Sequence, residues 1–277
     1  MKDFLRCGRF ELALGRPLVM GVVNVTPDSF YDGGRHADSQ AAIVHARRLA
    51  AEGADLLDVG GESSRPGAAP VTADEELARI LPVLEGIADL GVPVSVDTTK
   101  REVMRAVLER GAAMINDITA LATPGTLEVV AASEAAVCLM HMQGSPRTMQ
   151  ADPRYADVTV EVRDFLADRA TACVRAGIAR DRIVVDPGFG FGKTVEHNLT
   201  LLARLGEIAA LGFPVVAGWS RKSSLGRITG RPADDRLAAS VAAAMLAVQR
   251  GAKIVRVHDV AATRDALAVL AAVEGTE

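Results

Sequence analysis

Residues 92–111, VPVSVDTTKREVMRAVLERG, contain one complete strand–helix unit. The segment VPVSVD alternates polar and apolar residues like a short β-strand, and REVMRAVLERG spaces its apolar residues as an amphipathic helix does. Gly111 follows the helical pattern and favours a left-handed helix end. Because side chains alternate along a strand, Asp97 shares a face with Ser95. The stretch therefore predicts a β/α unit with a carboxylate at the carboxyl end of its strand.

The same unit recurs along the chain. Apolar segments alternate with longer amphipathic ones eight times, the apolar segments being LVMGVVNV (18–25), LLDVG (56–60), VPVSVD (92–97), AMINDI (113–118), AVCLMH (136–141), IVVDPG (183–188), PVVAGW (214–219) and IVRVHD (254–259). Glycine ends the helical segment before the next strand at Gly53, Gly91, Gly111, Gly177, Gly212 and Gly251. Eight units without a flexible linker predict a single α/β domain over residues 1–277, a (β/α)8 TIM barrel rather than a doubly wound sheet. Residues 1–17 would form a short N-terminal extension.

Composition excludes several classes of protein. The 277 residues are 49% hydrophobic and 24% charged, with a net charge of −4, so a basic face for nucleic acid is not expected. Cys7, Cys138 and Cys173 are odd in number and widely spaced, which predicts neither a disulfide framework nor a zinc site. The first 17 residues lack the apolar core of a secretory signal, and the Ala-rich stretch 238–248 covers only about half a bilayer. We therefore expect a cytoplasmic protein.

The stretch VDPGFGFGKT (185–194) ends in Gly-Lys-Thr, as a phosphate-binding P-loop does. That motif requires a glycine where this chain has Pro187, and proline offers no backbone N–H to a phosphate. The sequence therefore disfavours a nucleotide hydrolase. Lys193 is expected to begin a helix.

Polar residues gather at the carboxyl ends of the predicted strands, where (β/α)8 enzymes place their chemistry. They are Asn24, Asp58, Asp97, Asn116, His141, Asp186, Ser220 with Lys222, and Arg256 with His258. Two unusually long connections, residues 26–39 and 61–74, follow the first two strands and lie over the same face, either as lids or as solvated turns. Met104, Met245 and Leu246 lie on apolar helix faces and are expected in the core.

Asp97 and Asp186 end otherwise apolar strands, so each carboxylate needs a partner. One interpretation is a structural ion pair with Lys222. The other is recognition of a planar N–C–N edge, as in a pterin or guanine, because a carboxylate accepts two parallel N–H bonds. Asn116 would extend such recognition with a donor and an acceptor.

Cations form a second group: Arg65, Lys222, Arg256 and His258. Each alone is more often solvated or ion-paired, but together at one barrel mouth they would bind phosphate or pyrophosphate. Strand alternation places Arg256 and His258 on one face, and Asn24 could reach the anion through Mg²⁺. His141 is a weaker candidate. Motifs for covalent nucleophilic catalysis or metal hydrolysis, such as GxSxG, HExxH and CxxC, do not occur in the sequence.

Seven motifs in order carry a family resemblance: VVNVTPDSFYDGG, DVGGESSRPGA, SVDTTK, INDITA, DPGFGFGK, GWSRKS and RVHD. From about Leu18 to its C-terminus the chain resembles the dihydropteroate synthase family of folate biosynthesis, the target of sulfonamides. The resemblance implies a pterin-binding TIM barrel, usually homodimeric. With Mg²⁺ it would join 6-hydroxymethyl-7,8-dihydropterin pyrophosphate to 4-aminobenzoate and release pyrophosphate.

The resemblance also implies the site residues. Those for the pterin would be Asp97, Asn116, Met140, Asp186, Lys222 and Arg256. Those for pyrophosphate would be Asn24, which also serves Mg²⁺, Ser64, Arg65, Arg256 and His258. Those for aminobenzoate would be Ser64, Arg65, Pro66, Phe191, Lys222 and Ser223, closed by a lid of Thr26, Pro27, Asp28, Ser29 and Phe30. The family often has Thr in place of Ser64 and Ser in place of Tyr31, and either difference could alter the binding of aminobenzoate or of sulfonamides.

Catalysis would then depend on Asp97, Asp186, Lys222 and Arg256 through positioning and electrostatics. We expect a dissociative reaction in which pyrophosphate leaves first, and amine binding that requires the anion to be present. Two alternatives share the pterin pocket. A pterin-dependent methyltransferase would require a corrinoid partner, and a non-catalytic pterin-binding homologue would bind without turnover.

Overall fold

The computed structural model describes residues 4–25, 35–63 and 68–275. Its centre is a closed barrel of parallel strands in the order β10-β3-β4-β5-β6-β7-β8-β9. The strands are β3 (Leu18–Asn24), β4 (Leu56–Gly60), β5 (Val94–Asp97), β6 (Met114–Asp117), β7 (Ala136–Met140), β8 (Ile183–Asp186), β9 (Val215–Ala217) and β10 (Ala252–Val257). The predicted (β/α)8 barrel is confirmed.

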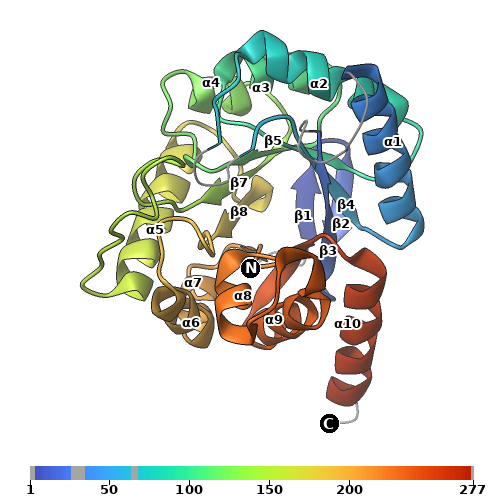
Figure 1. The fold of residues 1–277 in the computed structure, drawn as a ribbon. Coiled ribbons are helices and arrows are strands. Elements are labelled where there is room, and N and C mark those ends of the chain that lie inside the picture. Colours follow the sequence, from blue (N-terminus) through green and yellow to red (C-terminus); the bar gives the residue numbers. More distant parts are fainter. Residues whose placement is uncertain (1–3, 26–34, 64–67, 276–277) are drawn as a thin grey trace.

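Helices surround the strands in chain order, from α1 in blue to α10 in red (Figure 1). They are α1 (Arg35–Ala51), α2 (Ala73–Gly86), α3 (Arg101–Leu108), α4 (Thr126–Ala131), α5 (Val158–Arg175), α6 (Val195–Ala203), α7 (Leu205–Ala209), α8 (Ser223–Thr229), α9 (Leu237–Gln249) and α10 (Val260–Glu274), with short 3₁₀ turns at Arg180–Arg182 and Ala233–Asp235. The six glycines predicted to end helices all adopt positive φ. None of the described helices is long and apolar enough to cross a membrane.

The phase of the strands decides where the polar residues point. A cluster of side chains fills the barrel interior, and it includes Met20, Leu56, Met114, Cys138, Val184, Val216 and Ile254. Their neighbours, such as Val19 and Val255, face the helices instead. Because alternate residues share a face, the inward side continues toward the carboxyl ends through Asn24, Asp58, Asn116, Met140, Asp186 and Arg256. The sequence thus places a polar layer directly above the apolar interior.

A hairpin closes the opposite end of the barrel. Strands β1 (Phe4–Cys7) and β2 (Phe10–Ala13) pair antiparallel, and Leu5 and Cys7 are fully buried in the interior cluster. The Cys7 thiol donates to the Ala113 carbonyl at 3.3 Å, at the start of the β6 region. The predicted N-terminal extension therefore includes a plug for the N-terminal end of the barrel, which leaves the other end for chemistry.

Two expectations about helices are wrong, and they concern Leu246 and Lys193. The segment 195–212 forms two helices, because Arg204 leaves helical geometry and its guanidinium binds Asp157 and Glu207. Leu246 is 39% exposed rather than in the core, because it lies on the outer face of α9. Lys193 does not begin a helix: α6 starts at Val195, capped by the Thr194 hydroxyl. The Thr of Gly-Lys-Thr is therefore a helix cap.

Candidate active site

Arg256 lies at the centre of a buried polar chain in the barrel mouth. Its Nε donates to Asp58 Oδ2 at 2.6 Å, and its Nη2 donates to Asp97 Oδ2 at 3.3 Å. Asn116 Nδ2 donates to the same Asp58 oxygen at 3.0 Å. These four residues come from β10, β4, β5 and β6, so the closure of the barrel brings together side chains up to 198 positions apart.

Some acceptor atoms in this hydrogen-bonded chain of side chains are unused by the described residues. Asp58 Oδ1 and Asn116 Oδ1 are buried and have no hydrogen-bond partner among the described residues, and the same holds for Ser95 Oγ. Buried acceptors are normally satisfied, by protein, water or a ligand. Asn116 lies beside Asp97 in the strand register, so an acceptor and a carboxylate are adjacent at the mouth. The pair suits a ligand edge that carries N–H groups.

Asp186 approaches the same space from β8. Its Oδ1 accepts the Gly188 amide at 2.7 Å. Gly218 marks how close Asp186 comes to Arg256, because a Cβ on that glycine would lie 3.7 Å from both side chains. Met140, 4% exposed, pairs with Asp186 in the register of β7 and β8 and adds an apolar surface. A flat ring could thus be bordered by polar groups at its edge and apolar groups beside it.

The carboxylates resist ionisation in this setting. Burial, followed by repulsion from Asp58, raises the pKa of Asp97 to about 7 despite the attraction of Arg256. Burial also raises the pKa of Asp186, against the opposing charge of Lys222. A ligand that donates N–H groups would reverse both shifts, because such bonds favour the charged carboxylate. Perturbed acids of this kind are typical of functional sites.

Lys222 follows β9, the strand between those that carry Asp186 and Arg256. Its ammonium donates to the Phe189 carbonyl and lies 4.5 Å from the centre of the Phe191 ring. Burial lowers its pKa to about 8, although Asp186 counteracts the effect. Ser223 follows it as the first residue of α8. Among the described residues Lys222 has no ion pair with Asp97 or Asp186, so the interpretation as a structural salt bridge is wrong; the partner of Asp97 is Arg256.

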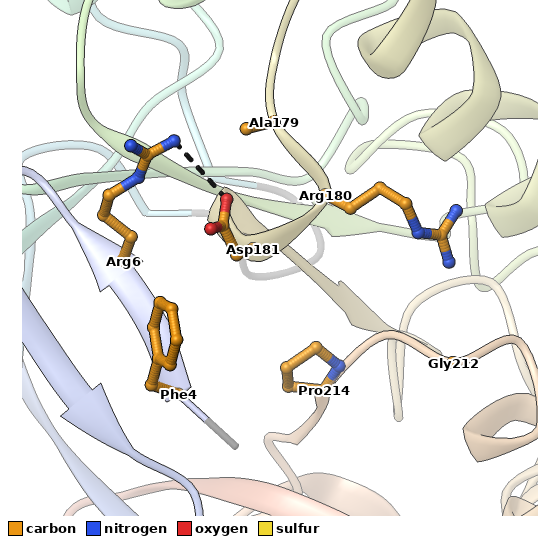
Figure 2. Close-up of a pocket in the computed structure, with 7 residues that line it drawn as sticks. All are labelled: Phe4, Arg6, Ala179, Arg180, Asp181, Gly212 and Pro214. Atoms are coloured by element: carbon orange, nitrogen blue, oxygen red, sulfur yellow. Dashed lines mark hydrogen bonds and ion pairs between the residues drawn. The ribbon is translucent and has the colours of Figure 1, made fainter. Parts of the chain in front are cut away.

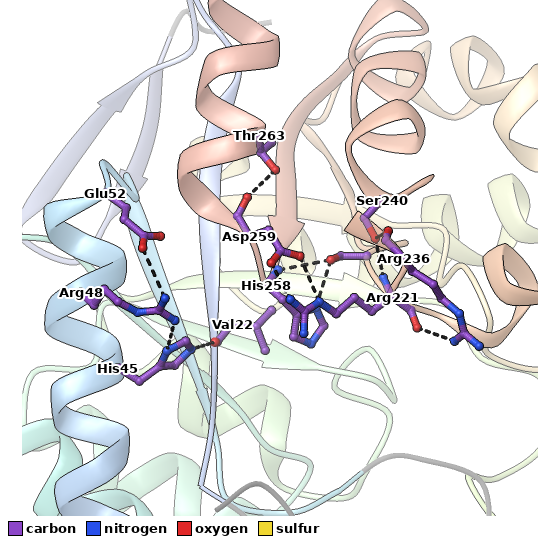
Figure 3. A network of polar contacts seen from close by, with 11 residues as sticks. Val22, His45, Arg48, Glu52, Arg221, Arg236, Ser240, His258, Asp259 and Thr263 are labelled. Atoms are coloured by element: carbon purple, nitrogen blue, oxygen red, sulfur yellow. Dashed lines mark hydrogen bonds and ion pairs between the residues drawn. The ribbon is translucent and has the colours of Figure 1, made fainter. Parts of the chain in front are cut away.

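An adjacent cavity of about 400 Å³ runs between α1 and the start of α10. Figure 3 shows many of its residues, with His45, Arg48 and Glu52 from α1 facing Arg221, His258 and Asp259. Asn24 and His258 line this cavity, whereas Arg256 does not. Arg256 and His258 therefore follow one strand face but serve two neighbouring spaces, one between the carboxylates and one beside the helix starts.

His258 is held by the preceding connection. Its backbone N–H donates to Ser220 Oγ at 3.2 Å, and its Nδ1 lies 3.0 Å from the same oxygen. Burial, then Arg256 and Arg221, lower the pKa of His258 to about 3. An incoming anion would oppose these cations and raise that pKa. Arg221 is paired with Asp259 and Arg256 with Asp58 and Asp97, so His258 stands as a neutral imidazole among ion-paired groups.

Several predicted residues lie outside the described part of the chain: Thr26, Pro27, Asp28, Ser29, Phe30, Ser64, Arg65 and Pro66. Among the described residues there is no cluster of three or more His, Cys, Asp or Glu side chains that could hold a metal ion. Asn24 supplies one neutral oxygen at the cavity that His258 also lines. That donor fits Mg²⁺ only if phosphate oxygens and water complete its shell.

A further cavity, of about 600 Å³, lies away from this chemistry. Figure 2 shows Arg6 of the hairpin facing Asp181, with Phe4 and Pro214 on opposite sides of the same cavity at the closed end of the barrel. Arg6 and Asp181 form an ion pair at 3.4 Å. None of the strand-end residues lines this cavity. The barrel mouth therefore remains the candidate site.

Sequence reasoning missed the role of Asp58. It was recognised as a polar strand residue, but its contacts with Arg256 and Asn116 depend on three strands meeting. The inward phase set by Leu56 is a signal that could have identified it, since Asp58 follows Leu56 on the same face. The burial of Lys193, 3% exposed, was likewise not predicted, because no sequence periodicity indicates a buried lysine.

The (β/α)8 barrel has a buried polar chain and a neighbouring cavity at its mouth, and the family model described as "Pterin binding enzyme" matches residues 20–258, which places the protein among the pterin-binding enzymes. A dihydropteroate synthase from Neisseria meningitidis serogroup C is 52% identical over 95% of this chain and 94% of its own length. Two structures of the Xanthomonas albilineans dihydropteroate synthase, each covering 99% of both chains, superpose with TM-scores of 0.94 (with 4-aminobenzoic acid, 53% identical) and 0.88 (with 7,8-dihydropteroate, 49%). The chain belongs to the dihydropteroate synthase family of transferases.

Proposed function

We propose that the barrel mouth joins 6-hydroxymethyl-7,8-dihydropterin pyrophosphate to 4-aminobenzoate, forming 7,8-dihydropteroate and pyrophosphate. The observation that carries the proposal is the chain Asn116–Asp58–Arg256–Asp97, which leaves acceptors unused at its open end. The pterin presents an N–C–N edge of donors to such acceptors. The protein is accordingly a transferase of folate biosynthesis.

In this proposal Asp97, Asn116 and Asp186 bind the polar edge of the pterin, Met140 borders its face, and Lys222 donates to its remaining acceptors. Arg256 is fixed by two carboxylates, so it can lie against the ring without reorganising when the reaction occurs. Preorganised charge of this kind stabilises a transition state more than mobile water does.

The bond changes follow a dissociative order. The C–O bond at the pterin methylene breaks, and pyrophosphate leaves with the electron pair. The neutral arylamine nitrogen then attacks the methylene carbon and loses one proton to solvent. Once the N–H groups of the bound pterin favour their ionised forms, Asp97 and Asp186 would stabilise positive charge that develops on the ring.

The departing pyrophosphate would occupy the cavity beside Asn24 and His258, with Arg256 at its border. Ser64 and Arg65 are assigned to the same anion by resemblance. Mg²⁺ held by Asn24 and the phosphate oxygens would supply charge neutralisation for the leaving group. His258 and Arg221 provide cationic or polar walls on the side that the structure describes.

The amine would bind where Phe191, Lys222 and Ser223 adjoin. The Lys222 ammonium above the Phe191 ring offers a cation for the aminobenzoate carboxylate next to an aromatic wall. Ser64, Arg65 and Pro66 would complete this pocket, and residues Thr26, Pro27, Asp28, Ser29 and Phe30 would cover it. Sulfonamides would compete with the amine here, because they share its aryl-amine shape.

Two further properties belong to the proposal. We expect a homodimer, since Leu246, Val269 and Val273 on the neighbouring helices α9 and α10 expose 39%, 63% and 60% of their surface. We expect a cytoplasmic location, because Cys7, Cys138 and Cys173 are buried free thiols, which suits a reducing compartment.

Product analysis tests the function. The wild-type protein with dihydropterin pyrophosphate, Mg²⁺ and 4-aminobenzoate should form dihydropteroate, and Asp186→Asn should lose most of this activity. Binding of pterin without product formation would support the non-catalytic alternative and overturn the proposal. A large ¹³C kinetic isotope effect at the methylene carbon would contradict the dissociative order, since it indicates associative displacement.

A further inference from the structure

Lys193 is a buried amino group with no direct role in the proposed reaction, and burial lowers its pKa well below the ordinary value of a lysine, although Asp186 opposes this shift. Its side chain is 3% exposed, and its ammonium lies between the connections that follow β7 and β8. It lies 2.9 Å from His141 Nδ1, 3.0 Å from the Phe191 carbonyl and 3.1 Å from the Gly188 carbonyl. The His141 carbonyl is a weaker fourth partner at 3.4 Å. Three strong acceptors match the three N–H groups of a lysine ammonium.

These partners are neutral, so the ammonium acts as a hub of hydrogen bonds rather than as half of an ion pair. His141 must present an unprotonated Nδ1 to accept, and burial, followed by the charge of Lys193, lowers the pKa of His141 to about 3. Such a group is costly to bury unless every donor is satisfied. A lysine in this position therefore requires an explanation beyond packing.

The two connections are in unusually close backbone contact. A Cβ on Gly188 would lie 1.9 Å from the His141 carbonyl oxygen, and one on Gly192 would lie 2.6 Å from the Gln143 carbonyl oxygen. Tyr155 adds a tie by donating its hydroxyl to the Gly192 carbonyl at 2.7 Å. With glycines at the contact, the connection after β8 depends on Lys193 and such ties to keep its shape.

The two closer carbonyls bound to Lys193, those of Gly188 and Phe191, belong to residues that adjoin the substrates' sites. The Gly188 amide donates to Asp186 Oδ1 at 2.7 Å, and the Phe191 ring lies 4.5 Å from the Lys222 ammonium. We propose that Lys193 is a positioning residue for both substrates, setting Asp186 for the pterin through Gly188 and the aromatic wall of the amine site through Phe191. This inference rests on the proposed function.

Lys193→Met, which keeps most of the length of the side chain but removes the ammonium, provides the first test. We expect KM for the pterin substrate and for 4-aminobenzoate each to rise about tenfold, as loss of one buried hydrogen bond would give. Arg182→Met is the matched control. Arg182 is also buried, 4% exposed, and donates to the Ala135 carbonyl at 2.9 and 2.6 Å at the closed end of the barrel. Its loss should lower thermal stability but leave both KM values unchanged.

A second pair of variants decides the matter if Lys193→Met does not fold. His141→Asn keeps an acceptor near the position of Nδ1 and should retain wild-type KM values, whereas His141→Leu removes it and should raise both. If neither the wild-type protein nor Arg182→Met forms dihydropteroate, the proposed function itself is overturned. Normal turnover in these two, with KM values for Lys193→Met or His141→Leu within twofold of wild type, would overturn only the role of Lys193.

Discussion

Replacing Asp58 by asparagine would remove one negative charge beneath the pterin site while keeping the size of the side chain. Asp58 is fully buried, and one of its oxygens accepts from both Arg256 and Asn116. Asparagine can still accept these bonds through its amide oxygen. The variant therefore isolates the charge of Asp58 from its shape.

The magnitude follows from the pairing of Arg256. Breaking a buried ion pair by removing one partner costs about 3–5 kcal/mol. Arg256 keeps Asp97 at 3.3 Å and leaves 18% of its side chain exposed, so we expect a loss at or just below the lower limit of that range, about 2–3 kcal/mol. For a chain of this length such a loss lowers Tm by roughly 5–10 °C.

The same variant should shift a pH profile. Ionised Asp97 is the form that accepts pterin N–H groups, so wild-type affinity should fall as pH drops below about 7. Asp58 is one cause of the raised pKa of Asp97, so Asp58→Asn should lower that pKa and move the fall in affinity to lower pH.

Fluorescence provides the assay. Trp219 is the sole tryptophan of the sequence, is 4% exposed and stacks on Phe189 at 4.9 Å beside the site, so its quenching should report pterin binding. Titrations from pH 5 to 8, with thermal melts of both proteins, give the two quantities. An unchanged Tm together with an unshifted pH profile would refute the reasoning about Asp58.

Three further predictions concern other residues. Because folding raises the pKa of Asp97, ionisation of Asp97 lowers the stability of the folded protein as pH rises from about 4 to 7. Thermal melts at pH 8 should therefore show Asp97→Asn more stable than wild type, although poorly active. A less stable variant would contradict this prediction. Gly188→Ala should lose pterin binding and at least about 3 kcal/mol in denaturant titrations, since its Cβ would overlap the His141 carbonyl; wild-type stability would contradict the geometry. Val269→Glu should make the protein monomeric in light scattering, with Val44→Glu, at a comparably exposed site on α1, as control; a persisting dimer would place the interface elsewhere.

The fold and the direction of the site could be predicted because both depend on local patterns. Alternation within strands and helical spacing between them specify eight β/α units, and the inward phase of residues such as Met114 and Val184 extends to Asn116 and Asp186. Side chains at strand ends were therefore assigned to the mouth without knowledge of the strand order.

What could not be predicted depends on contacts between distant segments. The partner of Asp97 is Arg256, 159 residues away, rather than Lys222, and only the closure of the barrel decides between them. Lys193 lies two residues before α6 because Thr194 caps that helix, and its burial follows from the close contact of two glycine-containing connections. Exposure of Leu246 likewise depends on which face of α9 meets its neighbours.

Pyrophosphate release is the measurement that tests the central claim most directly. Wild-type protein supplied with dihydropterin pyrophosphate and Mg²⁺ should release pyrophosphate in a manner that depends on 4-aminobenzoate. Lys222→Met and Asp97→Ala should lose at least about two orders of magnitude in kcat/KM, the loss typical of a transition-state contact, whereas Lys253→Met, on β10 outside the mouth, should remain at the wild-type rate. Pyrophosphate release that does not depend on 4-aminobenzoate, or that continues at the wild-type rate in both Lys222→Met and Asp97→Ala, would contradict the account.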